Sequence, residues 1–191
     1  MATSTKGKSK MKEKEEIVAE MEIPEKVSAK LNGSLLEVSG PKGKVVKDFN
    51  KIPVTISIAD KKIVIKPYGR RKKDLAVTNT SRSIVRNMIK GVLNGYTYKL
   101  KIIFAHFPIS IKIKDKQIFV ENFFGERSPR VVNIIGDCKV SVQGEDLVIQ
   151  GPSLDDVAQT AANVELATRV KDKDQRVFLD GLYVYSKEKG T

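Results

Sequence analysis

The most strongly charged stretch of the sequence comes immediately before the first predicted helix. Five cations gather in an irregular segment that also contains a proline and a glycine: Lys66, Arg70, Arg71, Lys72 and Lys73. Side chains on such a loop can spread along a phosphate backbone, and lysines beside a helix N-terminus oppose the helix dipole unless an external anion compensates them. The cluster therefore predicts contact with a polyanion, and a solvated run of charges is the simpler alternative.

Two lysines occupy a second candidate loop, the glycine-rich segment Gly40-Pro41-Lys42-Gly43-Lys44. Its GxxG spacing matches the KH module, but the KH loop joins two helices whereas this segment joins two predicted strands, so we exclude a KH domain. A turn that holds Lys42 and Lys44 against a phosphate and a plain turn fit the spacing equally well.

The second half of the sequence has its own basic loops. Arg127 and Arg130 flank Pro129, at a position that corresponds to the first glycine-rich loop. Four more cations lie between the second predicted helix and the last predicted strand, namely Arg169, Lys171, Lys173 and Arg176. Two aspartates are interleaved with them, so a self-neutralised surface loop is the alternative to contact with a polyanion.

Residues that could carry catalysis are sparse. His106 is the only histidine and Cys138 the only cysteine, so the chain can form neither a histidine pair for a metal nor an internal disulfide. No phosphate-binding loop, dinucleotide fingerprint, zinc-protease helix or nucleophile elbow occurs. Asp155 and Asp156 suit the first turn of a helix, where carboxylates complement the dipole. We expect no enzymatic activity, no metal, no cofactor and no small-molecule substrate.

The charge is distributed unevenly along the 191 residues. Lys and Arg number 35 against 23 Asp and Glu, a net charge of +12, and residues 22–104 account for all of it, since residues 1–21 carry +1 and residues 105–191 carry −1. Such a chain attracts nucleic acid or an anionic membrane. No predicted helix opposes a broad apolar face to lysines, and no apolar run could span a bilayer, so we expect nucleic acid and no membrane.

Two further features of composition narrow the function. A single cysteine and the lack of a secretory signal fit an intracellular location. Aromatic residues are few, with seven Phe, five Tyr and no Trp. Because single-stranded nucleic acid is commonly held by stacking its bases on aromatic rings, this composition favours contact through phosphates.

The hydrophobic pattern predicts two similar halves that follow a short arm. The arm, residues 1–21, is rich in Lys and Glu and has little to bury, so it is expected to be flexible. In each half, alternating apolar residues around short turns predict two hairpins, with strands at 27–31, 35–38, 54–58 and 63–65 in the first half and at 109–113, 118–120, 139–142 and 147–149 in the second.

Each half then changes to a helical period and ends in a strand. Asp74 is the expected N-cap of the first helix, and Ser153 with Asp156 predicts a capping box for the second. Final strands are expected at 96–104 and 181–185. The sequence therefore predicts an α+β fold of two tandem β-β-β-β-α-β repeats, each an antiparallel sheet packed on one helix, in domains 22–104 and 105–191. The short connection near Ala105-His106 predicts little movement between them.

A set of short motifs recurs in a fixed order along the chain. It consists of Ile23-Pro24, Gly40-Pro41-Lys42-Gly43, Asp48-Phe49-Asn50, Asn87-Met88-Ile89-Lys90-Gly91-Val92, Tyr98-Lys99, Ala105-His106-Phe107-Pro108, Asn122-Phe123, Gly125-Glu126, Val170-Lys171, Lys173-Asp174 and Phe178-Leu179-Asp180-Gly181. Over residues 22–190 this set closely resembles the large-subunit ribosomal protein six family in its archaeal and eukaryotic form, which is numbered nine in eukaryotes.

The resemblance implies a duplicated α+β protein of the cytoplasmic ribosome, without catalytic residues. It implies binding to the 3′ part of large-subunit ribosomal RNA beside the sarcin–ricin loop and the stalk base, near neighbouring ribosomal proteins and the docking region of translation factors. By position, the RNA contacts would lie in segments 40–44, 127–130 and 169–176. A free RNA-binding adaptor or chaperone, and a nucleic-acid enzyme that uses carboxylates, are the alternatives.

Two features depart from the family pattern. The arm of residues 1–20 lies outside it. The family is usually described as holding RNA chiefly through its second domain, whereas the surplus charge of this chain is in the first.

Overall fold

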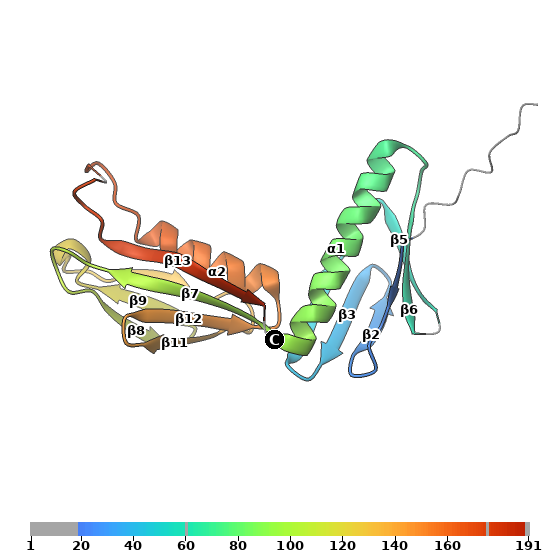
Figure 1. Cartoon of the computed structure of the whole chain (residues 1–191), viewed down its shortest axis with the longest axis horizontal. Coiled ribbons are helices and arrows are strands. Elements are labelled where there is room, and N and C mark those ends of the chain that lie inside the picture. Colours follow the sequence, from blue (N-terminus) through green and yellow to red (C-terminus); the bar gives the residue numbers. More distant parts are fainter. Residues whose placement is uncertain (1–18, 60, 175, 190–191) are drawn as a thin grey trace, which may run out of the picture.

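The chain forms two α+β repeats that lie side by side (Figure 1). The computed structural model describes residues 19–59, 61–174 and 176–189. Most of the expected arm, residues 1–18, lies outside the described residues, but its last part does not, because Ala19–Glu22 form strand β1. The expected fold class, α+β with tandem repeats of antiparallel sheet on one helix, is confirmed.

The first repeat packs two three-stranded antiparallel sheets against one long helix. The sheet orders are β1-β6-β5 and β2-β3-β4, and the helix is α1. The remaining bounds are β2 Ser28–Asn32, β3 Leu35–Gly40, β4 Gly43–Asp48, β5 Val54–Ala59, β6 Lys62–Pro67 and α1 Lys72–Asn94. The core closes where alternate residues of the strands meet one face of α1, and its fully buried members include Leu36, Val38, Ile63, Ile65, Val85 and Val92.

The second repeat is built in the same way around helix α2. Its sheets have the orders β10-β9-β8 and β11-β12-β7-β13, again with antiparallel pairing throughout. The bounds are β7 Tyr96–Ile103, β8 Ser110–Lys114, β9 Gln117–Glu121, the 3-10 turn η1 Phe123–Gly125, β10 Arg130–Asn133, β11 Lys139–Gln143, β12 Asp146–Gly151, α2 Leu154–Ala167 and β13 Gly181–Lys189. The fully buried core includes Leu100, Ile118, Leu147, Ile149, Val164 and Leu182.

Strand β7 changes the expected division between the halves. The sequence pattern assigns it to the end of the first domain, but β7 pairs with β12 and β13 in the sheet of the second repeat. The observed order of elements therefore differs in detail from the expected β-β-β-β-α-β. Each repeat contains a strand, a three-stranded meander, a hairpin and a helix, and the second repeat has β13 as an additional edge strand. Period-2 alternation shows that a segment is a strand but not which sheet accepts it. The pairing of β7 places the boundary between the repeats at Gly95. This glycine has a φ of 81° and directly follows the last residue of α1.

The start of α1 also differs from the expectation. The helix begins at Lys72 with Arg71 as N-cap, and Asp74 lies in the first turn, where its carboxylate accepts the Arg71 N–H at 2.8 Å. Lys72 and Lys73 are therefore helical and only Arg70 and Arg71 lie in the preceding loop. Ser153 is the N-cap of α2 as expected, and its Oγ accepts the N–H of Asp156 at 3.3 Å, which is one of the two hydrogen bonds of the expected capping box.

The two repeats meet at the C-terminal end of α1 (Figure 1). Pro152, between β12 and α2, lies against two glycines of the first repeat: a Cβ on Gly43 would come within 3.2 Å of its ring, and one on Gly91 would overlap its carbonyl oxygen. From the second repeat, Tyr96 Oη donates to the carbonyl oxygen of Asn87 at 3.0 Å. These close contacts, rather than the segment at Ala105-His106, limit movement between the repeats.

Candidate nucleic-acid interface

The first group of predicted RNA contacts lies at the free end of α1, away from the junction (Figure 1). Arg70, Arg71, Lys72 and Lys73, here called the helix-start cluster, are all exposed. Asp74 is the one acid in the first turn of α1, and its carboxylate is directed to the backbone N–H of Arg71. Four cations around a helix N-terminus are unfavourable for the helix itself, because the dipole is positive there, so an external anion would relieve the local charge.

Helix α1 carries further cations that the sequence reading missed. Arg82, Arg86 and Lys90, here called the helix ridge, are exposed and four residues apart, so they follow one another along one side of the helix. Together with Lys72 they extend over about 27 Å at 1.5 Å per residue. The spacing of four was visible in the sequence and would have identified them.

The glycine-rich turn between β3 and β4 serves packing. A Cβ on Gly40 would lie 2.8 Å from the carbonyl oxygen of Val92, and the N–H of Lys42 donates to that same oxygen at 2.9 Å. Lys44 forms an ion pair with Glu37 at 2.8 Å. The glycines thus allow the turn to approach the end of α1, and the side chain of Lys42 is left exposed.

The second half brings two distant loops together. The loop of residues 122–129 and the loop between α2 and β13 meet at the end of the second repeat that is remote from the junction (Figure 1). Five exposed cations from these loops form what we call the distal loop cluster: Arg127, Arg169, Lys171, Lys173 and Arg176. One of the interleaved acids, Asp174, accepts the backbone N–H of Arg176 at 2.9 Å and so helps to shape the loop.

Arg130 differs from its neighbour Arg127 in being used inside the protein. Its guanidinium makes two hydrogen bonds with the Glu126 carboxylate, at 2.9 and 2.5 Å, and a third with the carbonyl oxygen of Ala167 at 2.7 Å. It also lies 4.1 Å from the centre of the buried Phe123 ring. The hydrogen bonds lower the pKa of Glu126 below its ordinary value. This geometry gives Arg130 a structural role that the sequence did not distinguish from RNA contact.

His106 also connects two segments of the second repeat. Its Nδ1 lies 2.7 Å from Oδ2 of the buried Asp180, and the N–H groups of Ala105 and His106 donate to Oδ1 at 2.7 and 3.1 Å. Burial by itself would raise the pKa of Asp180, but these hydrogen bonds lower it below the ordinary value. The imidazole stacks on Phe178 with 4.9 Å between ring centres. The single histidine therefore connects the loop after β7 to the segment before β13.

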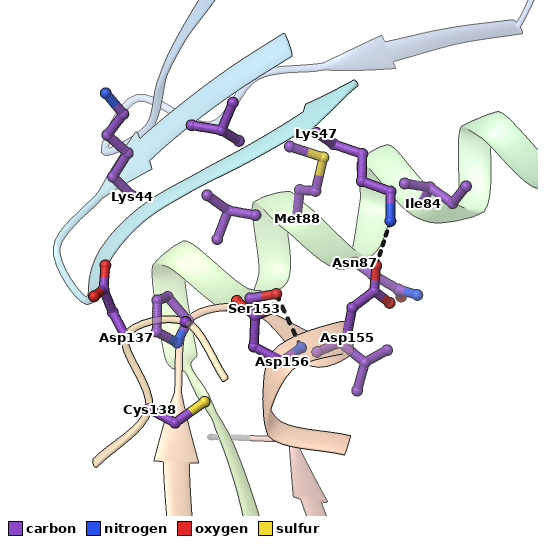
Figure 2. Close-up of a pocket in the computed structure, with 15 residues that line it drawn as sticks. Lys44, Lys47, Ile84, Asn87, Met88, Asp137, Cys138, Ser153, Asp155 and Asp156 are labelled. Carbon is purple, nitrogen blue, oxygen red and sulfur yellow. Dashed lines mark hydrogen bonds and ion pairs between the residues drawn. The ribbon is translucent and has the colours of Figure 1, made fainter. Parts of the chain in front are cut away.

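A cavity of about 400 Å³ lies between the repeats (Figure 2). Across it, Lys47 of the first repeat pairs with Asp155 of the second at 2.5 Å, and within the second repeat the N–H of Asp156 donates to Oγ of Ser153. Burial raises the pKa of the Cys138 thiol in this cavity to about 11, so the thiol is unreactive at neutral pH. The residues that line this cavity thus belong to the junction between the two repeats.

Within residues 19–59, 61–174 and 176–189, no cluster of three or more His, Cys, Asp or Glu side chains is arranged to hold a metal ion. Neither helix in this part of the chain is long and apolar enough to cross a membrane.

Comparison with known proteins identifies the family. A model described as ribosomal protein L6 matches residues 23–95 and 107–181, one segment in each repeat. The large ribosomal subunit protein uL6 of Staphylothermus marinus is 46% identical over 173 residues, which cover 88% of this chain and 94% of that protein. Proteins of the same name from Saccharolobus solfataricus and Aeropyrum pernix are 44% and 42% identical over 170 and 173 residues, covering 88% and 90% of this chain and 94% and 95% of theirs.

The matched segments agree with the two repeats of the fold, and the first ends at Gly95, before strand β7. The family consists of structural ribosome components, in agreement with the expectation that the chain is not an enzyme. The chain belongs to the ribosomal protein L6 family.

Proposed function

We propose that this protein is a structural constituent of the large ribosomal subunit that braces two separate segments of ribosomal RNA. Its relatives are named as large-subunit proteins and match over most of both chains. The observation that carries the mechanism is the placement of exposed cations at both ends of a molecule whose two repeats are packed together at one junction. Neutralising phosphates at each end releases counterions and fixes the two RNA segments relative to one another.

The exposure and pairing of the cations named from the sequence indicate which of them can contact phosphates. The helix-start cluster, the distal loop cluster and Lys42 are exposed and available for phosphates. Lys44 shares its charge with Glu37, and Arg130 is committed to Glu126 and Ala167, so we assign them no primary RNA contact. The helix ridge is added to the surface because it extends the helix-start cluster along α1.

The finer placement follows from the family resemblance. We propose that the RNA is the 3′ part of the large-subunit ribosomal RNA, beside the sarcin–ricin loop and the stalk base. Neighbouring ribosomal proteins and translation factors would then be close to the protein, and its location would be the cytoplasmic ribosome. The exposed cations of both repeats support an RNA surface, and the position on that RNA rests on the resemblance.

Co-sedimentation with large subunits tests the proposal. A variant with Arg127, Arg169, Lys171 and Arg176 changed to Ala is expected to leave the subunit at lower salt than the wild type, because each lost phosphate contact weakens binding. The matched control removes four lysines elsewhere on the second repeat, Lys112, Lys114, Lys116 and Lys139, and is expected to stay bound.

Two outcomes would contradict the proposal. Equal retention of both variants would reject the assigned surface. A wild-type chain that sediments free of large subunits at moderate salt, while still binding RNA, would instead support an RNA-binding adaptor or chaperone that acts outside the ribosome.

A further inference from the structure

A hollow of about 410 Å³ lies between the two distal loops of the second repeat. Its walls include Phe124 from η1, Arg130 from the start of β10, and Arg169, Lys171 and Lys173 from the loop after α2. The volume falls within the range of about 300–1,000 Å³ that is typical of sites for small ligands. It is separate from the cavity at the junction, which is lined by other residues.

One wall of the hollow is an aromatic ring held by an unusual backbone. Phe124 has a φ of 51°, in the left-handed region that a bulky side chain rarely adopts, and Asn122 and Gly125 on either side of the Phe123–Phe124 pair also have positive φ. Phe123 beneath it is buried and meets Phe124 edge to face, with 4.8 Å between ring centres. An unfavourable conformation that is maintained to place a ring at the edge of a hollow is typical of a binding residue.

The charges of the hollow favour an anion next to that ring. Glu126 is the one carboxylate among the lining residues, and its pairing with Arg130 neutralises it. Arg169, Lys171 and Lys173 then give the lining a surplus of three positive charges. The ammonium of Lys173 lies 4.8 Å from the Phe178 ring centre and 5.6 Å from that of Phe124, so cation and aromatic faces adjoin.

We propose that this hollow receives an unpaired nucleotide of RNA, whose base stacks on Phe124 while its phosphates contact Arg169, Lys171 and Lys173. The Asp and Glu side chains of an acidic peptide would use the cations but would offer no aromatic face to the ring, whereas a single nucleotide supplies both phosphate and base. The inference rests on the proposed function, since it assumes that the distal loops face RNA. It adds a specific contact to a surface that otherwise recognises only phosphates.

Two short RNA hairpins of equal charge test the site with the full-length chain. One hairpin of about 20 nucleotides carries a single bulged adenosine, and the other carries an abasic residue at the same position. The wild type is expected to bind the abasic hairpin about tenfold more weakly, the effect of losing one stacked base. F124L is expected to bind both hairpins equally, at the level of the wild type with the abasic hairpin.

The control variant is Phe107→Leu. The Phe107 ring is 45% exposed and lies beside Gly125, but it does not line the hollow, so this variant is expected to keep the tenfold preference. Equal binding of both hairpins by the wild type would overturn the site even if F124L failed to fold. If both hairpins bound equally well but removal of the charges of the distal loop cluster weakened binding to both, only the nucleotide site would be rejected and the proposed function would be retained. Failure of the wild type to bind either hairpin would overturn both.

Discussion

The two repeats share one fold but distribute their charge in opposite ways. With the boundary at Gly95, Lys99 and Lys101 move to the second repeat, and residues 22–94 carry a net charge of +10 against +1 for residues 95–191. Seven of the 16 cations of the first repeat lie at the start of α1 and along the helix ridge. Five of the 14 cations of the second repeat form the distal loop cluster, in two loops at its far end.

Pairing explains why the second repeat has little net charge and still presents a basic surface. Several lysines on its sheets are paired with acids, as in Lys99–Glu188 at 2.8 Å and Lys112–Glu121 at 2.7 Å, whereas among the described residues no ion pair involves a cation of the distal loop cluster. Net charge therefore describes the attraction of a whole domain to RNA, and the placement of unpaired cations describes contact. A domain that is neutral overall can still carry a binding surface.

The largest effect is expected from charges placed in the two cores. Val85 in α1 and Val164 in α2 are completely buried. Val85→Asp or Val164→Asp buries an unpaired carboxylate and should cost about 3–5 kcal/mol, a large fraction of the roughly 5–15 kcal/mol that stabilises a typical domain. Backbone amide NMR at neutral pH should show loss of native signals from the substituted repeat. A fully native spectrum for either variant would show that the helix does not close its core as described.

The next effect concerns the junction that couples the repeats. Gly91→Ala places a Cβ against the carbonyl oxygen of Pro152 and should cost about 1–3 kcal/mol, despite the better helix propensity of Ala. Residual dipolar couplings should report a changed orientation between the repeats. Ser83→Ala, on the exposed side of the same helix, is the control and should leave the orientation unchanged. A more stable Gly91 variant with the native orientation would refute the coupling.

Two nearby arginines of the second repeat are expected to differ in role, one structural and one in binding. Arg130→Ala removes hydrogen bonds to Glu126 and Ala167 and should lower the free energy of unfolding by about 2 kcal/mol, whereas Arg127→Ala should change it by less than about 0.5 kcal/mol. Urea denaturation measures both. Equal effects on stability would mean that the guanidinium of Arg130 is as free as that of Arg127.

The smallest effect is a gain in stability at the start of α1. Replacing both Lys72 and Lys73 by Ala removes cations from the positive end of the helix dipole, so each change should stabilise the first repeat by about 0.3–1 kcal/mol at low salt and by less at high salt. Thermal unfolding at two salt concentrations measures this. Lys171→Ala, in a loop of the second repeat, is the comparison and should have no such effect. Destabilisation by the double change would contradict the view that these lysines are kept for binding.

The sequence predicted the elements well where a local pattern determines them. Asn32-Gly33 marked a hairpin that forms as expected, and Ser153 marked the start of α2. It failed where partners distant in the chain decide. The alternation in Tyr96–Ile103 is the same whether the strand joins the first sheet or the second, so only the pairing could assign β7. Likewise, nothing near Pro129 distinguishes Arg130, which reaches the end of α2, from Arg127.

The most direct test of the two-ended brace is hydroxyl-radical footprinting of ribosomal RNA in large subunits that contain the wild type or a charge variant. The wild type should protect two separate RNA segments. Changing Arg70, Arg71, Lys72 and Lys73 to Ala should expose one segment, and changing Arg127, Arg169, Lys171 and Arg176 to Ala should expose the other. Loss of the same segment in both variants, or of neither, would contradict the account.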